Sequence, residues 1–403
     1  MNRLQAIVIE TADQLRARAE AWDVLWRRSE VVLPTVRAET LALWLEQFAA
    51  GKRFRAVVIE QDGRLLAALP LTTRRIKRLA SVADLPNNPW AVGGDLLLDP
   101  DSDVPAVLDL LLTEVARGRW PLLWLEDVEV ESPRWNAFFQ ATQRARWSYE
   151  VRGLRDVALI DIGDDWNRFT AGLSAKFYKD LKRRARRLEK QGDVQLRIVS
   201  QLRPSDVDDA LRRAFEVERQ SWKGAAGTSI IQTPGMLEFF SRQARALADW
   251  GQLRLYFLEM DGEPIAFEYG YLSGGVFFAH KISYLEEFAK ASPGNLLRWK
   301  MLEHMFSSGD VRVLDNFGEL TDSMKKWMTR SYRVARVVLA PPRLVSRAML
   351  AAYRRLKPQS EDDRPNPTAP TSNSSDSPPT APAIAPPIET GGAPPPPMTT
   401  TPQ

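Results

Sequence analysis

Two apolar runs, each interrupted by an Asp-Gly pair, constrain the fold of this chain most strongly. One is FRAVVIEQDGRLLAALPLT, residues 54–72, and the other is LRLYFLEMDGEPIAFEYGYL, residues 253–272. An Asp-Gly pair between two runs of strand-forming residues predicts a β-hairpin with a two-residue turn. One hairpin falls in each half of the chain, so the sequence predicts a structural duplication with a sheet in each half.

The segments around the hairpins predict helices that flank these sheets. In the first half we expect helices at 12–29, 37–50 and 104–117 and a strand at 122–126. In the second half we expect strands at 194–199, 276–283 and 311–317, with helices at 204–220 and 295–306. This order predicts a mixed α/β fold class (α+β in character), with mixed central sheets covered by helices. Residues 151–165 would cross from one half to the other.

A basic segment opens the second half. SAKFYKDLKRRARRLEKQG, residues 174–192, carries eight Lys and Arg side chains and two acidic ones. Its apolar residues Phe177, Leu181, Ala185 and Leu188 are spaced as one stripe of an α-helix. Ser174 suits an N-cap. We therefore expect a helix docked on a core, whose cations meet solvent, the phosphates of a coenzyme or tRNA, or those of a lipid- or nucleotide-linked sugar.

Composition excludes several kinds of chemistry. The chain has 403 residues and no cysteine, so disulfides, thiolate metal sites and a cysteine nucleophile are excluded. Only His280 and His304 are histidines, which excludes a multi-histidine metal centre. The N-terminal residues lack a signal-peptide pattern, and no apolar run reaches membrane-spanning length. We expect a cytoplasmic protein without a metal and without an integral membrane segment.

The last residues differ from the rest in composition. Segment 358–403 holds 14 of the 28 prolines and almost no large apolar residues, which predicts a disordered Pro-rich tail. It also carries five acidic residues and one basic one, so residues 1–357 have a net charge of +8. We expect domains at 1–155 and 156–345, a basic helix end at 346–357, and the tail.

The passage from the strand at 276–283 to the next helix carries a candidate phosphate site. Ser292 lies at an N-cap position, Pro293 suits the first helical turn, and Gly294 allows close backbone approach. Free N–H groups and the dipole make a helix N-terminus suited to a phosphate or pyrophosphate. The same Ser-Pro-Gly is also an ordinary helix start.

Several segments in order resemble the GNAT acyltransferase superfamily. They are SAKFYKDLKRRARRLEKQG, GEPIAFEYGYL, SPGNLLRWKMLEHMFSSG and LDNFGELTDSMKKW, with WDVLWRRS and DGRLLAALPL in the first half. The branch they resemble is the one named for cellulose-biosynthesis acetyltransferases, which is related to Fem-type peptidyl transferases. The resemblance implies two tandem GNAT-like domains, the first degenerate, and transfer of an acyl group from an acyl-CoA, most simply acetyl-CoA, to an amine or hydroxyl.

The resemblance also assigns binding residues. Ser292, Gly294, Asn295 and Leu296 correspond to the pyrophosphate loop, with Lys290 just before them, although this loop has one glycine where the superfamily usually has two. Lys326 and Trp327, with Asp315 and Gly318, match the branch's Asp–Gly–Lys–Trp run, and we expect Lys326 and Trp327 to bind substrate. The aromatic-plus-lysine pair that usually precedes this tryptophan is replaced by Ser323-Met324.

Acyl transfer needs a base for the acceptor, and four side chains are candidates. Alternation places Glu268 beside Ala266 and Gly270, opposite Phe267 and Tyr269, although an ion-paired glutamate fits the same pattern. Asp315 ends an apolar strand and could instead cap the following turn. His280 is a base or a packed core histidine. Tyr284 lies just beyond the end of the same predicted strand.

Other residues could hold the acceptor or a surface. Trp90 and Trp222 lie in loop-like contexts and could stack on a sugar. Segment 339–356 is apolar with several arginines and could touch a membrane surface peripherally.

Three functions remain open. The first is an acyl-CoA-dependent transferase acting on a small-molecule or glycan acceptor of the cell envelope or of exopolysaccharide biosynthesis. The second is a Fem-like transferase that takes its donor from aminoacyl-tRNA. The third is a non-catalytic protein built on a double GNAT scaffold.

Overall fold

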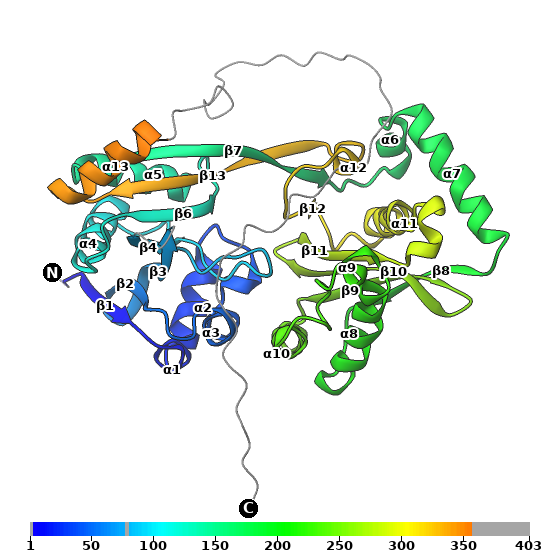
Figure 1. Ribbon diagram of the computed structural model, residues 1–403, viewed down its shortest axis with the longest axis horizontal. Coiled ribbons are helices and arrows are strands. Elements are labelled where there is room, and N and C mark those ends of the chain that lie inside the picture. The colour runs from blue at the N-terminus through cyan, green and yellow to red at the C-terminus, as the bar shows by residue number, and fades with distance from the viewer. Residues whose placement is uncertain (1–2, 77–79, 357–403) are drawn as a thin grey trace, which may run out of the picture. The chain divides into compact units, whose positions relative to one another are not determined.

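A computed structural model describes residues 3–76 and 80–356 (Figure 1). The strands of this part form one mixed sheet in the order β1-β2-β3-β4-β6-β13-β7-β12-β11-β10-β9-β8, and β5 pairs with β3. The strands are β1 (Gln5–Ile9), β2 (Phe54–Gln61), β3 (Arg64–Ile76), β4 (Ala80–Asp84), β5 (Leu97–Leu98), β6 (Leu123–Val128), β7 (Ser148–Asp161), β8 (Val194–Val199), β9 (Leu253–Met260), β10 (Glu263–Ser273), β11 (Val276–Tyr284), β12 (Val313–Asp315) and β13 (Arg330–Ala340).

Helices cover both faces of the sheet. They are α1 (Ala12–Arg16), α2 (Ala19–Arg28), α3 (Ala38–Phe48), α4 (Val104–Arg117), α5 (Pro133–Arg144), α6 (Trp166–Ala171), α7 (Ala175–Glu189), α8 (Pro204–Arg219), α9 (Trp222–Ala225), α10 (Met236–Asp249), α11 (Pro293–Ser308), α12 (Asp322–Lys325) and α13 (Leu344–Leu356), with 3-10 turns η1 (Pro34–Val36) and η2 (Glu286–Ala291). The expected fold class, a mixed sheet flanked by helices, is confirmed.

Both hairpins form where the Asp-Gly pairs predict them. Asp62 and Gly63 have φ of 53° and 77°, and Asp261 and Gly262 have φ of 53° and 87°. Positive φ at both central residues defines the type I′ turn, whose twist matches that of the strands. Each half of the sheet therefore contains one hairpin, β2–β3 or β9–β10, whose turn is specified by the same Asp-Gly pair.

Two long strands join the halves into one sheet. β7 and β13 run side by side between them (Figure 1), paired from Arg330 opposite Leu159 to Ala340 opposite Ser148. β7 also pairs with β12 of the second half, and β13 with β6 of the first. The expected domain boundary at 155/156 thus lies inside β7, and the chain returns to the first half at its end. The Pro-rich segment 358–403 lies outside the described residues.

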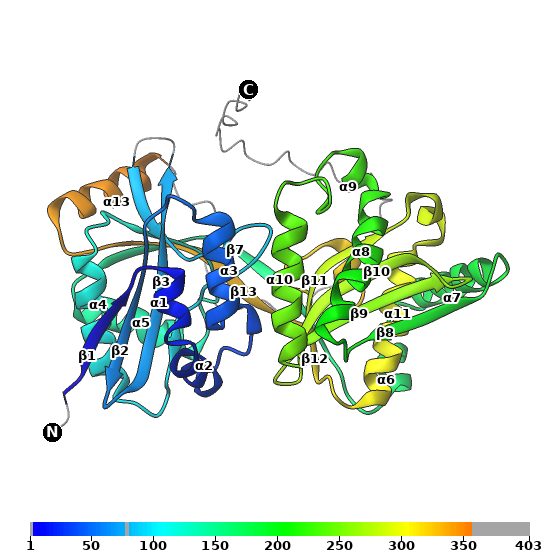
Figure 2. The same ribbon diagram turned by 90° about the horizontal axis from the view of Figure 1, so that it is seen from below.

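The two faces of the sheet have different cores. On one face a single apolar cluster extends through both halves, from Trp22 and Trp44 to Phe215 and Phe240. Helices α3 and α10 pack together there (Figure 2), with the rings of Phe48 and Phe239 5.0 Å apart. On the other face the first half has its own core under α4 and α5, and the second half has one under α7 and α11. We call the shared side the α10 face and the second half's other side the α11 face.

β11 parts from β12 after three residue pairs. The two strands are parallel and paired only from Val276 opposite Val313 to Phe278 opposite Asp315. Asn316 then turns to β7, where its backbone N–H and its Nδ2 both donate to the carbonyl oxygen of Ala158, at 3.1 and 3.0 Å. Beyond Phe278, β11 pairs with β10 alone, at Ala279 and at residues 281–284. We call the resulting gap in the sheet, between residues 279–284 of β11 and the chain after Asp315, the wedge.

A bulge lies in β11 where the wedge begins. Gly270 of β10 pairs with Ala279 and Tyr269 pairs with Lys281, so His280 is an extra residue. A bulge changes which face the following side chains occupy. It needs glycine at position 270, because a Cβ there would lie 2.3 Å from the carbonyl oxygen of Phe278 and 2.6 Å from the Phe277 ring.

We therefore expect Gly270→Ala to lower the free energy of unfolding by about 1–3 kcal/mol, the usual cost of overpacking. Gly163→Ala is the matched control, since the nearest atom to a Cβ at position 163 lies 4.0 Å away. Urea unfolding followed by circular dichroism measures both. Equal stability of the two variants would contradict the close approach at the bulge.

Candidate active site

The N-terminus of α11 lies where the sequence predicts a phosphate loop. Ser292 precedes the helix with φ of +54°, a left-handed conformation that is uncommon for serine and often found at functional sites. Its side chain does not cap the helix. Instead Ser292 Oγ and the carbonyl oxygen of Lys290 accept hydrogen bonds from Arg184 of α7, at 3.0 and 2.7 Å. The basic helix thus fixes the loop directly.

Fewer N–H groups are free at this terminus than the motif suggests. The N–H groups of Asn295 and Leu296 both donate to the carbonyl oxygen of Ser292, at 3.0 and 3.1 Å. Pro293 has no N–H. Among the described residues of this first turn, the N–H that lacks a protein acceptor is therefore that of Gly294. Leu296 is buried under the helix. A phosphate here would meet one backbone donor and the cations of α7 and Lys290.

The C-terminal motif packs on the same loop. Asn295 Oδ1 accepts hydrogen bonds from Trp327 Nε1 at 3.1 Å and from Ser323 Oγ at 3.2 Å. Trp327 is buried, with its ring edge-on to Phe177 of α7 at 4.9 Å. The Nζ of Lys326 lies 5.6 Å from the Phe177 ring. The structure therefore brings Asn295, Lys326 and Trp327 together around the start of α11.

The bulge sorts the side chains of β11 between the two faces. Tyr284 and Ile282 lie on the α11 face, each within 4 Å of where a Cβ on Gly294 would be. His280 and Lys281 both lie on the α10 face, because Phe240 of α10 is 5.8 Å from the His280 ring and 5.6 Å from the Lys281 Nζ. Two consecutive side chains therefore share a face beside the wedge.

His280 is held among aromatic rings. Its Nδ1 is hydrogen-bonded to the hydroxyl of Tyr271, and that hydroxyl lies 3.3 Å from Oε1 of Gln243. Burial, with Lys281 as a second cause, holds the pKa of His280 well below its usual value. A neutral imidazole that is hydrogen-bonded to Tyr271 and to the backbone of Trp90 suits orientation of a neighbour better than a role as a free base.

Glu268 is fully buried in an ion pair. Arg298 of α11 donates to Glu268 Oε1 at 2.7 Å and to Asn316 Oδ1 at 3.0 Å. Burial raises the pKa of Glu268, against the effect of Arg298, and Oε2 has no hydrogen-bond partner among the described residues. The expected position beside Ala266, opposite Phe267 and Tyr269, is found. Through Arg298, these bonds connect Glu268 of β10, helix α11 and Asn316 at the end of β12.

Asp315 lies at the other side of the wedge. Its carboxylate accepts from the Phe317 N–H at 2.8 Å and from the Tyr332 hydroxyl at 3.1 Å. Burial raises the pKa of Asp315 to about 7, and nearby Glu129 acts in the same direction. The ring of Phe317 lies 6.0 Å from that of His280, so Asp315 and His280 border the same region of the α10 face.

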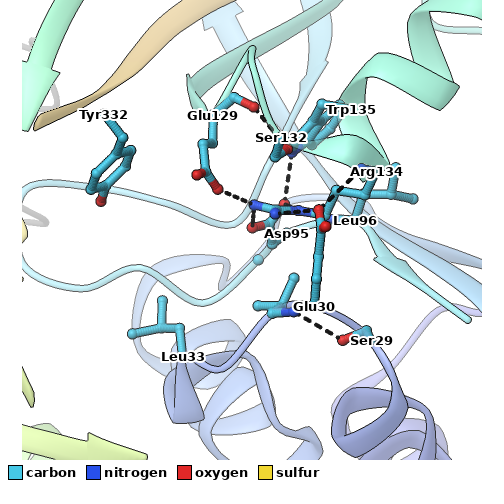
Figure 3. Close-up of polar contacts among 12 residues, drawn as sticks. Ser29, Glu30, Leu33, Asp95, Leu96, Glu129, Ser132, Arg134, Trp135 and Tyr332 are labelled. Atoms are coloured by element: carbon cyan, nitrogen blue, oxygen red, sulfur yellow. Dashed lines mark hydrogen bonds and ion pairs between the residues drawn. The ribbon is translucent and has the colours of Figure 1, made fainter. Parts of the chain in front are cut away.

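Beyond Tyr332 the first half supplies an acidic cluster (Figure 3). Arg134 at the start of α5 is buried and pairs with three carboxylates, those of Glu30 and Asp95 at 2.8 Å and that of Glu129 at 3.0 Å. One cation faces three anions, so the cluster has excess negative charge. Burial raises the pKa of Glu129 despite Arg134.

The predicted site residues thus fall into two groups around one wedge. Lys290, Ser292, Gly294, Asn295, Leu296, Tyr284, Lys326 and Trp327 gather on the α11 face, whereas His280 and Asp315 border the α10 face. Glu268 lies on the α11 face as well, in its ion pair with Arg298. Trp222 begins α9 and is 45% exposed, and the adjacent Lys223 contacts the carbonyl oxygen of Ile282 at 3.2 Å.

Sequence reasoning did not single out three residues of this region: Lys281, Arg298 and Tyr332. The adjacent polar pair His280-Lys281 interrupts an apolar strand and could have signalled the bulge. Arg298 and Tyr332 gave no local signal, because their partners are distant in sequence.

Other expectations concern metals and membranes. In residues 3–76 and 80–356 no group of three or more His, Asp or Glu residues is placed to hold a metal ion. In the same part of the chain, none of the helices combines the length and apolar character needed to cross a membrane. Segment 339–356 forms the end of β13 and α13, where Leu344, Val345 and Leu356 are exposed.

Comparison with known proteins agrees with this geometry. Residues 175–322 match the family model described as an acetyltransferase (GNAT) domain. The crystal structure of FemX has a TM-score of 0.55 at 10% identity, covering 86% of this chain and 99% of its own. The protein described as a lysylphosphatidylglycerol synthetase from Agrobacterium fabrum, represented by its C-terminal domain, has a TM-score of 0.50 at 14% identity, covering 85% and 97%. No curated protein sequence matches the chain.

The two solved structures share the fold, and the family model identifies the domain that contains the wedge and the α11 loop. The second half thus contains the segment that is similar to the GNAT acetyltransferase model, and the expected enzyme class, an acyltransferase, is confirmed.

The raised pKa of Asp315 predicts how stability depends on pH. In the unfolded chain the carboxyl ionises near its ordinary pKa of 3.8, but in the folded protein it keeps its proton up to about pH 7. The folded state thus binds more protons between these values, and this carboxyl favours folding less as the pH rises from 4 to 7.

We expect Asp315→Asn, which cannot ionise, to become more stable relative to wild type as the pH rises across this range. Denaturant unfolding of both proteins at several pH values measures the difference. A constant difference from pH 4 to pH 7 would show that Asp315 is not held protonated.

Proposed function

We propose that the protein is an acyl-CoA-dependent N- or O-acyltransferase that transfers the acyl group directly to its acceptor. The observation that carries the proposal is the wedge between β11 and β12, with a helix N-terminus on one face and Asp315 on the other. The thioester would lie in the wedge, where β11 residues 279–284 have no strand partner on the β12 side.

The donor would occupy the α11 face. Its phosphates would meet the Gly294 N–H, Lys290 and the cations of α7, since Arg184 already contacts the loop. The acyl-CoA, most simply acetyl-CoA, supplies an activated thioester. Backbone N–H groups that a bulge removes from the ladder can polarise its carbonyl. Tyr284, on the same face as Gly294, would return a proton to the leaving thiolate.

The acceptor would enter on the α10 face, between the halves. Asp315 is the base that we propose, because a carboxyl with a pKa of about 7 can both take and release a proton near neutral pH. Asp315 would take the proton of an ammonium acceptor before the free amine attacks the thioester carbonyl, or that of a hydroxyl acceptor as its oxygen attacks. The new C–N or C–O bond then replaces the C–S bond, and the thiolate leaves. His280 would orient the acceptor. Glu268 remains the second candidate for the base, although its bond to Arg298 favours a structural role.

In this proposal the first half is a degenerate partner that shapes the acceptor side. Its loop 86–92 and its acidic cluster both face the second half's site residues. The same proposal includes domain boundaries at 1–155 and 156–345 and a cytoplasmic location. It also includes membership of the cellulose-biosynthesis branch and an acceptor related to the cell envelope or to exopolysaccharide. Trp222 and the exposed end of α13 are its further candidate contacts, with a glycan and a membrane surface respectively.

One observation favours a second candidate, a transferase that takes its donor from aminoacyl-tRNA. Four cations of α7 have no side-chain hydrogen bond, ion pair or ring contact among the described residues: Lys176, Lys179, Arg186 and Arg187. A row of free cations beside the donor loop also suits a nucleic-acid backbone, whose binding weakens steeply with salt.

Gly294→Ala separates a ligand site from an ordinary helix start. A Cβ at this position would meet the protein only at 3.7 Å or beyond, and alanine favours helix over glycine. The fold should therefore keep its melting temperature, whereas a donor that approaches the backbone closely should bind at least tenfold more weakly, a loss of about 1.4 kcal/mol.

Isothermal titration of both proteins with acetyl-CoA and longer acyl-CoAs measures this, with a tRNA filter-binding assay at low salt beside it. Binding of an acyl-CoA that the substitution weakens supports the first candidate. Binding of tRNA alone supports the second. If the folded wild-type protein binds neither ligand, both proposals fail.

A further inference from the structure

Lys281 is an amine without an acidic partner. Its Nζ lies 3.5 Å from the carbonyl oxygen of Pro89, 5.4 Å from the ring of Trp90 and 5.6 Å from that of Phe240. Among the described residues no carboxylate is within ion-pair distance of it. Lys281 as a whole residue is partly exposed, so it is not sealed from solvent.

The groups around Lys281 leave its charge uncompensated. From α8 and α9 it faces Glu218 and Lys223, but Glu218 is already bonded to Lys223 at 2.9 Å and to the Ile230 N–H at 2.9 Å. From β11 itself it faces the neutral His280. Burial and Lys223 lower the pKa of Lys281 to about 7, and Glu218 only partly opposes them.

The first half of the chain holds the Trp90 ring beside Lys281. Asn88 Oδ1 accepts from the N–H groups of Trp90 and Ala91 at 2.8 and 3.0 Å, and Trp44 Nε1 donates to the Ala91 carbonyl at 3.1 Å. Loop 86–92 is therefore braced on α3, and Trp90 is held beside Lys281. The second half supplies the amine and the first half supplies the ring.

We propose that Lys281 and Trp90 form a subsite for an anionic group, a carboxylate or a phosphate, carried by the acceptor. An anion at the Nζ would supply the missing counter-ion, and in a partly enclosed site a charge-assisted hydrogen bond is stronger than in bulk solvent. Trp90 would pack against the planar or apolar part beside that anion.

This inference rests on the proposed function only in assigning the anion to the acceptor. The Asp315 side of the same face is acidic and the Lys281 side is basic, so an acceptor with an amine at one end and an acid at the other would match both. The acceptor class that follows is an amino acid, peptide or acidic sugar rather than a neutral glycan.

The test is the titration of the Lys281 amine itself. Lysines of the full chain are reductively methylated with ¹³C, and the Lys281 signal is assigned by its loss in Lys281→Arg. Its pH titration is followed alone, with inorganic phosphate and with acetate. We expect either anion to raise the pKa of Lys281 by about one unit, which corresponds to tenfold tighter binding of the anion to the charged amine. Lys52, an exposed lysine, is the internal control.

The outcomes decide the proposal without reference to turnover. A response to phosphate or to acetate supports the subsite and tells which group it prefers, and Trp90→Ala should reduce that response. If neither anion moves the Lys281 signal more than that of Lys52, the proposal is overturned. Acyl-CoA binding should be unchanged in Trp90→Ala, because the donor lies on the α11 face. If the wild-type protein binds no acyl-CoA, that result would instead count against the proposed function alone.

Discussion

The buried contact between Arg298, Glu268 and Asn316 is the interaction on which the site depends. It holds the chain after β12 against β7 and α11, so β12 cannot continue beside β11 and the wedge stays open. Removing two charges from water costs several kcal/mol, and a paired geometry with further hydrogen bonds offsets this cost. The ion pair of Arg298 and Glu268 therefore specifies that the wedge stays open more than it adds to the free energy of unfolding.

The bulge at His280 gives that wedge two chemically different sides. Without the extra residue, Lys281 would lie on the α11 face beside the donor loop. With it, Ile282 and Tyr284 face Gly294, while His280 and Lys281 face the first half. In the proposed reaction the donor and the acceptor would bind on opposite faces of the sheet and would meet only where the sheet is open. The acidic region around Asp315 and the basic one at Lys281 both lie on the α10 face, the proposed acceptor side.

Features with local causes could be predicted from the sequence. Both Asp-Gly hairpins, the strand at 194–199, the helix at 104–117 and the basic helix after Ser174 lie where their patterns indicate. Features with distant causes could not. β13 pairs with strands of both halves, α10 packs on α3, and Arg298 meets its partners only through the tertiary fold. Ser292 shows the limit at one residue: its position before α11 was predicted, but its side chain bonds Arg184 rather than the helix.

The most direct measurement of this account is the crystal structure of the protein with coenzyme A or a non-hydrolysable acyl-CoA analogue bound. The account predicts the phosphates at Ser292–Leu296 beside Arg184, and the sulfur in the wedge between Ala279 and Asn316. It also predicts that the acyl group points toward Asp315 on the α10 face. A coenzyme bound on the α10 face, or outside a wedge closed by pairing of β11 with the chain after β12, would contradict it.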